Sequence, residues 1–124
     1  RLRSRGLGDV YKRQGMPYVW GGSSPDTGFD CSGYVCWVYN QAGYDVGRTT
    51  ANGLWQKCQH ISEAEAKPGD LVFFKGTYDT PGMSHCGIYL GNGMMVSAGD
   101  PIKYANIHSS YWQKYLAGFG RLSK

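Results

Sequence analysis

A single cysteine stands between an acidic residue and a serine in the stretch FDCSGYV, residues 29–35. Cys31 could be a buried structural thiol, one half of a disulfide, a metal ligand or a nucleophile. A thiol attacks as the thiolate, so a nucleophilic role requires surroundings that lower its pKa. It also requires a base within hydrogen-bond reach, and the base requires an orienting partner.

Three histidines are available as that base. His60 falls in a polar connection and His108 in a long loop, whereas His85 opens a predicted strand after a glycine-containing loop. A rigid strand end is where a catalytic base can be held still. Pairing across the predicted hairpin brings Ser97 near this histidine, which makes Ser97 the local candidate for the third polar group.

The other cysteines, Cys36, Cys58 and Cys86, are interpreted as small buried hydrophobes. Cys31 and Cys36 lie five residues apart in a predicted helix, which is poor geometry for a disulfide. No CxxC pair is present to hold a structural zinc ion. We therefore expect free thiols and no metal, and this spacing disfavours a disulfide-stapled secreted domain.

The elements that position these residues follow from periodicity and capping. Apolar residues three and four apart predict a helix over 31–42, which Gly43 ends. Asp30 is a good N-cap residue, so Cys31 falls in the first turn. There, unpaired amide groups and the positive end of the helix dipole favour a thiolate and can hold an oxyanion.

Further helical and strand signals follow along the chain. They predict an α+β fold, with N-terminal helices packed on one side of an antiparallel β-sheet. A cysteine at a capped helix start together with a histidine on the sheet is a papain-like arrangement. The predicted elements are a helix over 49–58 capped by Thr49 or Thr50, a strand over 71–75, a hairpin of strands 85–90 and 94–98, a loop over 100–113 and a strand over 116–122.

The net charge of +4 is concentrated at one end of the 124-residue chain. Residues 1–14 hold five of the 13 Lys and Arg and one of the nine Asp and Glu, so residues 15–124 are neutral and do not support a basic nucleic-acid surface. Residues 1–14 resemble translated sequencing-adapter sequence, and we expect them to be foreign. A basic linker or a first helix are the alternatives.

No apolar run approaches the ~20 residues of a membrane span, and no h-region marks a signal peptide.

Three blocks carry a family resemblance: PYVWGGSSPDTGFDCSGYV, KPGDLVFF and SHCGIYLGNGMMV. In order and spacing they resemble the signatures of NlpC-type cell-wall cysteine peptidases, papain-like enzymes that cut peptidoglycan stem peptides. The similarity runs from about Gly15 to Leu122, so we expect one peptidase domain over 15–124. The tail is similar to the peptidase modules of bifunctional lytic proteins of Gram-positive conjugative elements. A lysozyme-like domain often precedes that module, so we expect the chain to be a fragment.

The resemblance implies roles for individual residues. Cys31 matches the nucleophile and His85 the general base. Tyr18 matches a tyrosine that lines the active site, although it could be an ordinary strand aromatic. Asp30 and Ser32 match residues flanking the nucleophile, which would contact polar groups of the substrate, while Asp30 could instead act purely as an N-cap.

The third position departs from the family pattern. Twelve residues after the base, the family usually has His, Asn or Gln, and this chain has Ser97. A serine hydroxyl can accept a hydrogen bond from the imidazole. The orienting group could also be a water molecule, Asp100 or Asn106.

The resemblance implies an endopeptidase that cleaves the bond from γ-D-glutamate to the following diamino acid, without a cofactor. It implies an extracellular monomer acting at the cell wall of a Gram-positive bacterium, with peptidoglycan stem peptide as its partner, no nucleic acid and no membrane insertion. The alternatives are an amidase or acyltransferase using the same thiol, and a cell-wall binding module with a weakened site. Aromatic residues at 18–20, 37 and 111–112 could wall a groove, although core packing is their default role.

Overall fold

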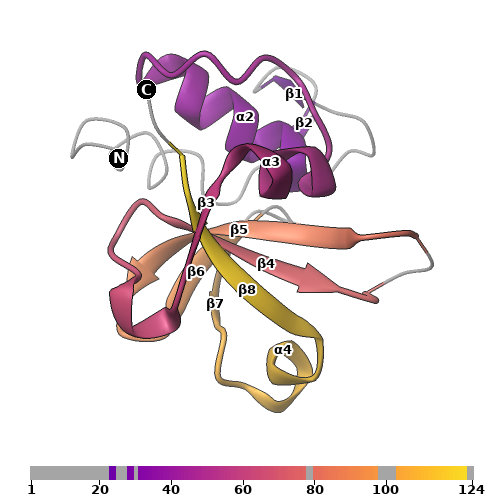
Figure 1. Cartoon of the computed structure of the whole chain (residues 1–124), viewed down its shortest axis with the longest axis vertical. Coiled ribbons are helices and arrows are strands. Elements are labelled where there is room, and N and C mark those ends of the chain that lie inside the picture. The colour runs from indigo at the N-terminus through magenta and orange to yellow at the C-terminus, as the bar shows by residue number, and fades with distance from the viewer. Residues whose placement is uncertain (1–22, 25–27, 30, 78–79, 98–102, 123–124) are drawn as a thin grey trace.

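The computed structural model describes residues 23–24, 28–29, 31–77, 80–97 and 103–122. Two helices cover one face of a six-stranded antiparallel sheet, and a short helix lies on the opposite side (Figure 1). This confirms the predicted α+β class. The elements are β1 (Ser23–Ser24), β2 (Gly28–Phe29), α2 (Cys31–Gln41), α3 (Ala51–Lys57), β3 (Gln59–Ile61), η1 (Glu63–Glu65), β4 (Leu71–Lys75), β5 (Met83–Gly91), β6 (Met94–Ser97), β7 (Lys103–Asn106), α4 (Ser110–Tyr115) and β8 (Leu116–Arg121).

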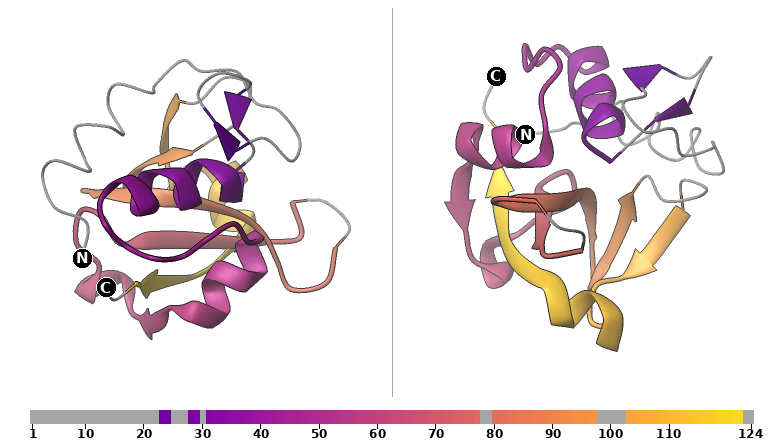
Figure 2. Two further views of the ribbon diagram at one scale, coloured as in Figure 1. Left: turned by 90° about the horizontal axis from the view of Figure 1, so that it is seen from above. Right: turned by 90° about the vertical axis from the view of Figure 1, so that its right-hand side faces the viewer.

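The six-stranded sheet runs in the order β3-β8-β4-β5-β6-β7. Strands β4 to β7 form the expected meander, but β8 returns to lie between β3 and β4. Figure 1 shows α2 and α3 on the same side of the sheet, and in the left view of Figure 2, seen from above, α2 lies over the strands. None of the helices in the described part of the chain is long and apolar enough to cross a membrane.

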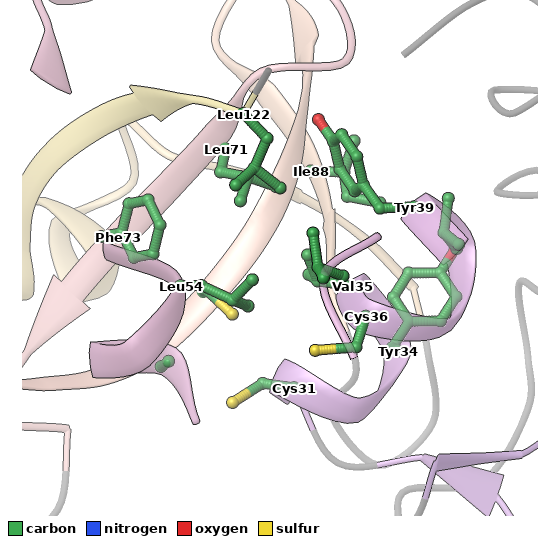
Figure 3. Close-up of a cluster of buried hydrophobic side chains, with 14 of the residues drawn as sticks. Cys31, Tyr34, Val35, Cys36, Tyr39, Leu54, Leu71, Phe73, Ile88 and Leu122 are labelled. Carbon is green, nitrogen blue, oxygen red and sulfur yellow. The ribbon is translucent and has the colours of Figure 1, made fainter. Parts of the chain in front are cut away.

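The core between α2 and the sheet is built from alternate residues of β4 and β5. Leu71, Phe73 and Ile88 project toward α2 and meet Val35 and Tyr39, all fully or almost fully buried (Figure 3). Burying an aliphatic or aromatic side chain of this size contributes about 1.5–3 kcal/mol. This packing fixes α2, and with it the position of its first residue.

A second apolar cluster covers the opposite face of the sheet. Val72 and Phe74 of β4 point there because successive strand residues alternate between faces. They pack with Met95, Phe119 and the α4 side chain Trp112. Strand β4 is therefore buried on both faces, which explains its unbroken apolar sequence LVFF.

A buried ion pair ties the last strand to the turn before β4. Asp70 is fully buried, and its carboxylate accepts hydrogen bonds from Arg121 Nε at 2.9 Å and Arg121 Nη2 at 2.8 Å. The backbone N–H of Lys67 donates to the same carboxylate at 2.8 Å. The hydroxyl of Tyr39 on α2 donates to the carbonyl of Gly69 in this turn. These bonds hold β8, the turn and α2 together.

The predicted elements agree closely with those observed in the first half of the chain. Helix α2 and strand β4 lie where periodicity placed them, and Thr50 caps α3 by accepting a hydrogen bond from Gly53 N at 3.0 Å. Six short elements occur where a loop or a polar connection was expected, namely β1, β2, β3, η1, β7 and α4. His60, expected without such support, lies in β3.

Candidate active site

Cys31 is the first residue of α2. Its side chain packs against the core and is only 8% exposed, yet it also lines the open cleft described next. Figure 3 shows the sulfur projecting away from the helix. The thiol is therefore shielded by protein while one side remains accessible to a ligand.

The cleft has a volume of about 550 Å³ and lies where the starts of α2, α3 and β5 meet. Cys31 and His85 both line it. Most of the other lining residues are polar, and they come from the starts of α2, α3 and β5 and from the loops before α3 and β5. The lining residues are Cys31, Ser32, Arg48, Thr49, Thr50, Ala51, Asn52, Thr77, Thr80, Pro81, Met83, Ser84 and His85.

The surroundings hold the pKa of the Cys31 thiol well below its ordinary value. The largest cause is a hydrogen bond from the side chain of Cys86, while burial acts in the opposite direction. A hydrogen bond from His85, the positive charge on His85 and the backbone N–H of Cys86 lower the pKa further. The arrangement therefore favours the thiolate, the form in which cysteine is a nucleophile.

His85 is the third residue of β5 and is half-buried. Its ring stacks on Trp112, with centroids 5.1 Å apart and planes at 25°, and lies 5.8 Å from the Phe74 ring. Its Nε2 is buried without a hydrogen-bond partner among the described residues. Among the described residues, therefore, no hydrogen bond orients the ring from Nε2.

Ser97 lies on the same face of the sheet as His85. Residues two apart on a strand share a face, and a Cβ built on Gly87 would lie 3.2 Å from the Ser97 Cβ. Ser97 is buried, but within the described residues no hydrogen bond joins it to His85. The orienting role of Ser97 remains a prediction.

The alternative orienting groups have different positions. Asn106 pairs with Met94 at the far end of β6, and its Oδ1 accepts a hydrogen bond from His108 N, so it is not brought near His85. Asp100 lies outside the described residues.

The remaining predicted site residues fall partly outside the described structure. Ser32 is buried next to Cys31 and lines the cleft, and its Oγ accepts a hydrogen bond from Arg48 Nη1 at 3.1 Å. Tyr18 and Asp30 lie outside the described residues. Their substrate-binding roles remain predictions.

Sequence reasoning missed two contacts of Cys31 and His85. Cys86 was assigned to the core, where it is fully buried, but its thiol also contacts the sulfur of Cys31. Trp112 was read as a groove or core aromatic, and it stacks on His85. Only tertiary packing brings Trp112 to the histidine, because 27 positions separate them in a sequence that carries no local signal for the contact.

None of the four cysteines, all of which are described, forms a disulfide. Among the described residues, no group of three or more His, Cys, Asp or Glu side chains is placed to hold a metal ion.

Comparison with known proteins identifies the class of this fold and site. The NlpC/P60 family model matches residues 15–121, and the chain belongs to this family. This family membership, together with relatives named as an endopeptidase and a glutamyl hydrolase, supports a hydrolase of the peptidase class.

Among curated relatives, the chain is 48% identical over 117 residues to the "Bifunctional muramidase/DL-endopeptidase CwlT" of Bacillus subtilis, covering 92% of this chain and 35% of the relative. It is 40% identical over 116 residues to the "Gamma-DL-glutamyl hydrolase" of the same species, covering 91% of this chain and 28% of the relative. The chain thus spans about a third of the length of these proteins. A solved NLP/P60-family structure from Staphylococcus aureus, titled as similar to a lipoprotein, matches with a TM-score of 0.91 at 42% identity, covering 96% of this chain and 40% of that one.

Proposed function

We propose that this chain is a cysteine endopeptidase that cleaves peptidoglycan stem peptides between γ-D-glutamate and the following diamino acid. The observation that carries the proposal is a thiol of lowered pKa, on the first residue of a helix, in the same cleft as an imidazole. Relatives named as a DL-endopeptidase and a γ-DL-glutamyl hydrolase support this choice of bond.

The mechanism assigns one task to each group. The Cys31 thiolate attacks the γ-carbonyl carbon, and the electron pair moves to the oxygen. The amide groups at the start of α2, with the hydroxyl of Tyr18, stabilise that oxyanion. The imidazolium of His85 gives its proton to the leaving amine of the diamino acid.

Water then completes the reaction. It attacks the thioester carbonyl while His85 accepts its proton, and the sulfur departs as thiolate with the γ-carboxylate as product. Asp30 and Ser32, next to the nucleophile in sequence, are proposed to contact the free amine and polar groups of the substrate. The names of these relatives also support a cell-wall location and a longer parent protein with a further lytic domain.

The test is digestion of purified muropeptides followed by mass spectrometry and amino-terminal labelling. The proposal predicts new amino termini on the diamino acid. Cys31→Ala is expected to abolish them by lowering the cleavage rate by several orders of magnitude. The melting temperature should not change. Cys36→Ala, which removes a buried thiol of the same helix, is the matched control and should retain cleavage. Cleavage by Cys31→Ala at the parent rate would remove Cys31 from the mechanism.

A second candidate function is a cell-wall peptide-binding module with a weakened site. The observation that favours it is the absence, within the described residues, of a hydrogen bond between Ser97 and His85. This module would retain muropeptides without cutting them. Transfer of the acyl group to an added amine, or release of an amide nitrogen, would instead indicate an acyltransferase or amidase using the same thiol.

A further inference from the structure

The orientation of His85 requires an explanation. The proposed mechanism needs one ring nitrogen of His85 aimed steadily at the sulfur, and a polar third residue ordinarily fixes such a ring from its other nitrogen. Here that other nitrogen, Nε2, is buried without a hydrogen-bond partner among the described residues. Ser97 shares the face of the sheet but does not bond to the ring.

Two aromatic rings pack against the imidazole instead. Trp112 of α4 stacks on it at 5.1 Å with the planes 25° apart, and Phe74 of β4 lies 5.8 Å away at 50°. Trp112 and Phe74 also contact each other, with ring centroids 4.6 Å apart. The two aromatics belong to the apolar cluster on the sheet face opposite α2.

The position of Trp112 separates it from substrate. It is not among the residues that line the cleft, whereas His85 is. The indole therefore packs against the histidine from outside the cleft, where it can act on the base without touching the peptide. A flat stack restricts rotation of the imidazole out of its plane, and the indole face also attracts the imidazolium cation.

We propose that Trp112 is a positioning residue for the catalytic base, holding the plane of the His85 ring where the hydrogen-bonding third residue does not. This inference rests on the proposed function for its kinetic consequence. It makes the short helix α4, which sequence reasoning read as loop, a part of the machinery that keeps the thiolate and imidazole paired.

The test compares Trp112→Leu and Trp112→Phe with the parent chain. The first readout is the pH dependence of Cys31 alkylation by iodoacetamide, with the modified site identified by peptide mass mapping. The groups facing the sulfur are His85 and Cys86, both on β5, while Arg48 lines the same cleft. Because His85 lowers the thiol pKa by hydrogen bond and charge, loss of ring orientation should move the acid limb of this profile upward by about half to one pH unit in Trp112→Leu.

The second readout is muropeptide cleavage. Trp112→Leu should lower kcat by between about tenfold and a hundredfold, as expected for a misplaced catalytic group. KM should stay unchanged, because Trp112 lies outside the cleft lining. Trp112→Phe retains a flat ring and should recover most of both the rate and the alkylation profile.

The matched control is Trp55→Leu. Trp55 is also half-buried and also stacks on a histidine, His60, with ring centroids 3.5 Å apart, but neither residue lines the cleft. Trp55→Leu should lose about as much stability as Trp112→Leu, but the pH profile of Cys31 alkylation should stay unchanged. If Trp112→Leu does not fold, Trp112→Met decides, because methionine fills the space without a flat ring. An upward shift of its alkylation profile supports the proposal, and an unchanged profile overturns it.

The outcomes distinguish this inference from the proposed function. An unchanged kcat and an unchanged alkylation profile in folded Trp112→Leu would overturn the positioning role, even if the parent cleaves muropeptides. If the parent does not cleave but Trp112→Leu shifts the alkylation profile, the positioning role stands and the proposed substrate is wrong.

Discussion

At the residue scale, the proposed nucleophile Cys31 depends on an unexpected neighbour. Burial raises the pKa of its thiol, so the lowered value requires compensation by donors at short range. The principal donor is Cys86, one residue after the proposed base His85 on β5. Two consecutive residues of one strand thus both act on the Cys31 sulfur.

This role predicts a pH effect for Cys86→Val. Valine fills the buried space and keeps the backbone N–H, but it removes the thiol donor, so the pKa of Cys31 should rise. The acid limb of kcat/KM should then move to higher pH by about one unit, since a hydrogen bond to a charged group is worth about 1.5–3 kcal/mol. Cleavage rates between pH 5 and 9 measure the limb.

Cys36→Val is the control for that measurement. Cys36 is equally buried in α2 but does not line the cleft, so its replacement should leave the acid limb in place. An unshifted limb in Cys86→Val would mean that the Cys86 thiol does not stabilise the thiolate.

At the element scale, the parts of the fold with strong local signals were predictable from sequence. Helix α2 has apolar spacing over three turns, and β4 is a continuous apolar run between a Pro-Gly-Asp turn and a polar loop. Cys31 and His85 could be singled out because each falls at the start of such an element. Their roles followed from the chemistry of helix and strand ends and from the family signatures.

The missed elements are short and depend on tertiary contacts. Strand β3 has three residues, β7 has four and α4 has six, too few for a periodic signal. Strand β3 forms by pairing with β8, which follows it by 55 positions in the sequence. The stack of Trp112 on His85 is likewise visible only once α4 packs under β4.

Strand β8 depends on its ion pair with the turn before β4. Arg121→Leu should lower the free energy of unfolding by about 2–3 kcal/mol, because it leaves the fully buried carboxylate of Asp70 without its bidentate partner. The value lies below that for a wholly buried pair, since the arginine side chain is 31% exposed. Urea unfolding followed by tryptophan fluorescence provides the measurement.

Lys75→Leu is the comparison for Arg121→Leu. Lys75 is an exposed cation at the end of β4, and its loss should change the free energy of unfolding by no more than about 0.5 kcal/mol. Equal, small effects of the two substitutions would show that Asp70 is satisfied without Arg121.

At the scale of the whole molecule, the cleft forms where two layers meet. Packing of α2 on the sheet brings a helix start to a strand start, and the loops before α3 and β5 complete the wall. Cys31 and His85 stand on α2 and β5, whereas the loops contribute the lining residues Arg48, Thr49, Thr50, Thr77, Thr80 and Pro81. Because loops tolerate substitution better than the elements that they connect, this part of the wall can change without moving Cys31 and His85.

The whole chain also carries its charge unevenly, which leads to a prediction for residues 1–14. The family match begins at residue 15, and the remaining residues hold eight basic and eight acidic side chains. A chain of residues 15–124 should therefore cleave muropeptides with the same kcat/KM as the full chain. Its free energy of unfolding should lie within about 0.5 kcal/mol of that of the full chain. It should elute earlier from a cation exchanger, because the charge of +4 has been removed. If the truncated chain elutes earlier but is less stable by much more than 0.5 kcal/mol, or cleaves much more slowly, then residues 1–14 belong to the folded domain and are not foreign to it.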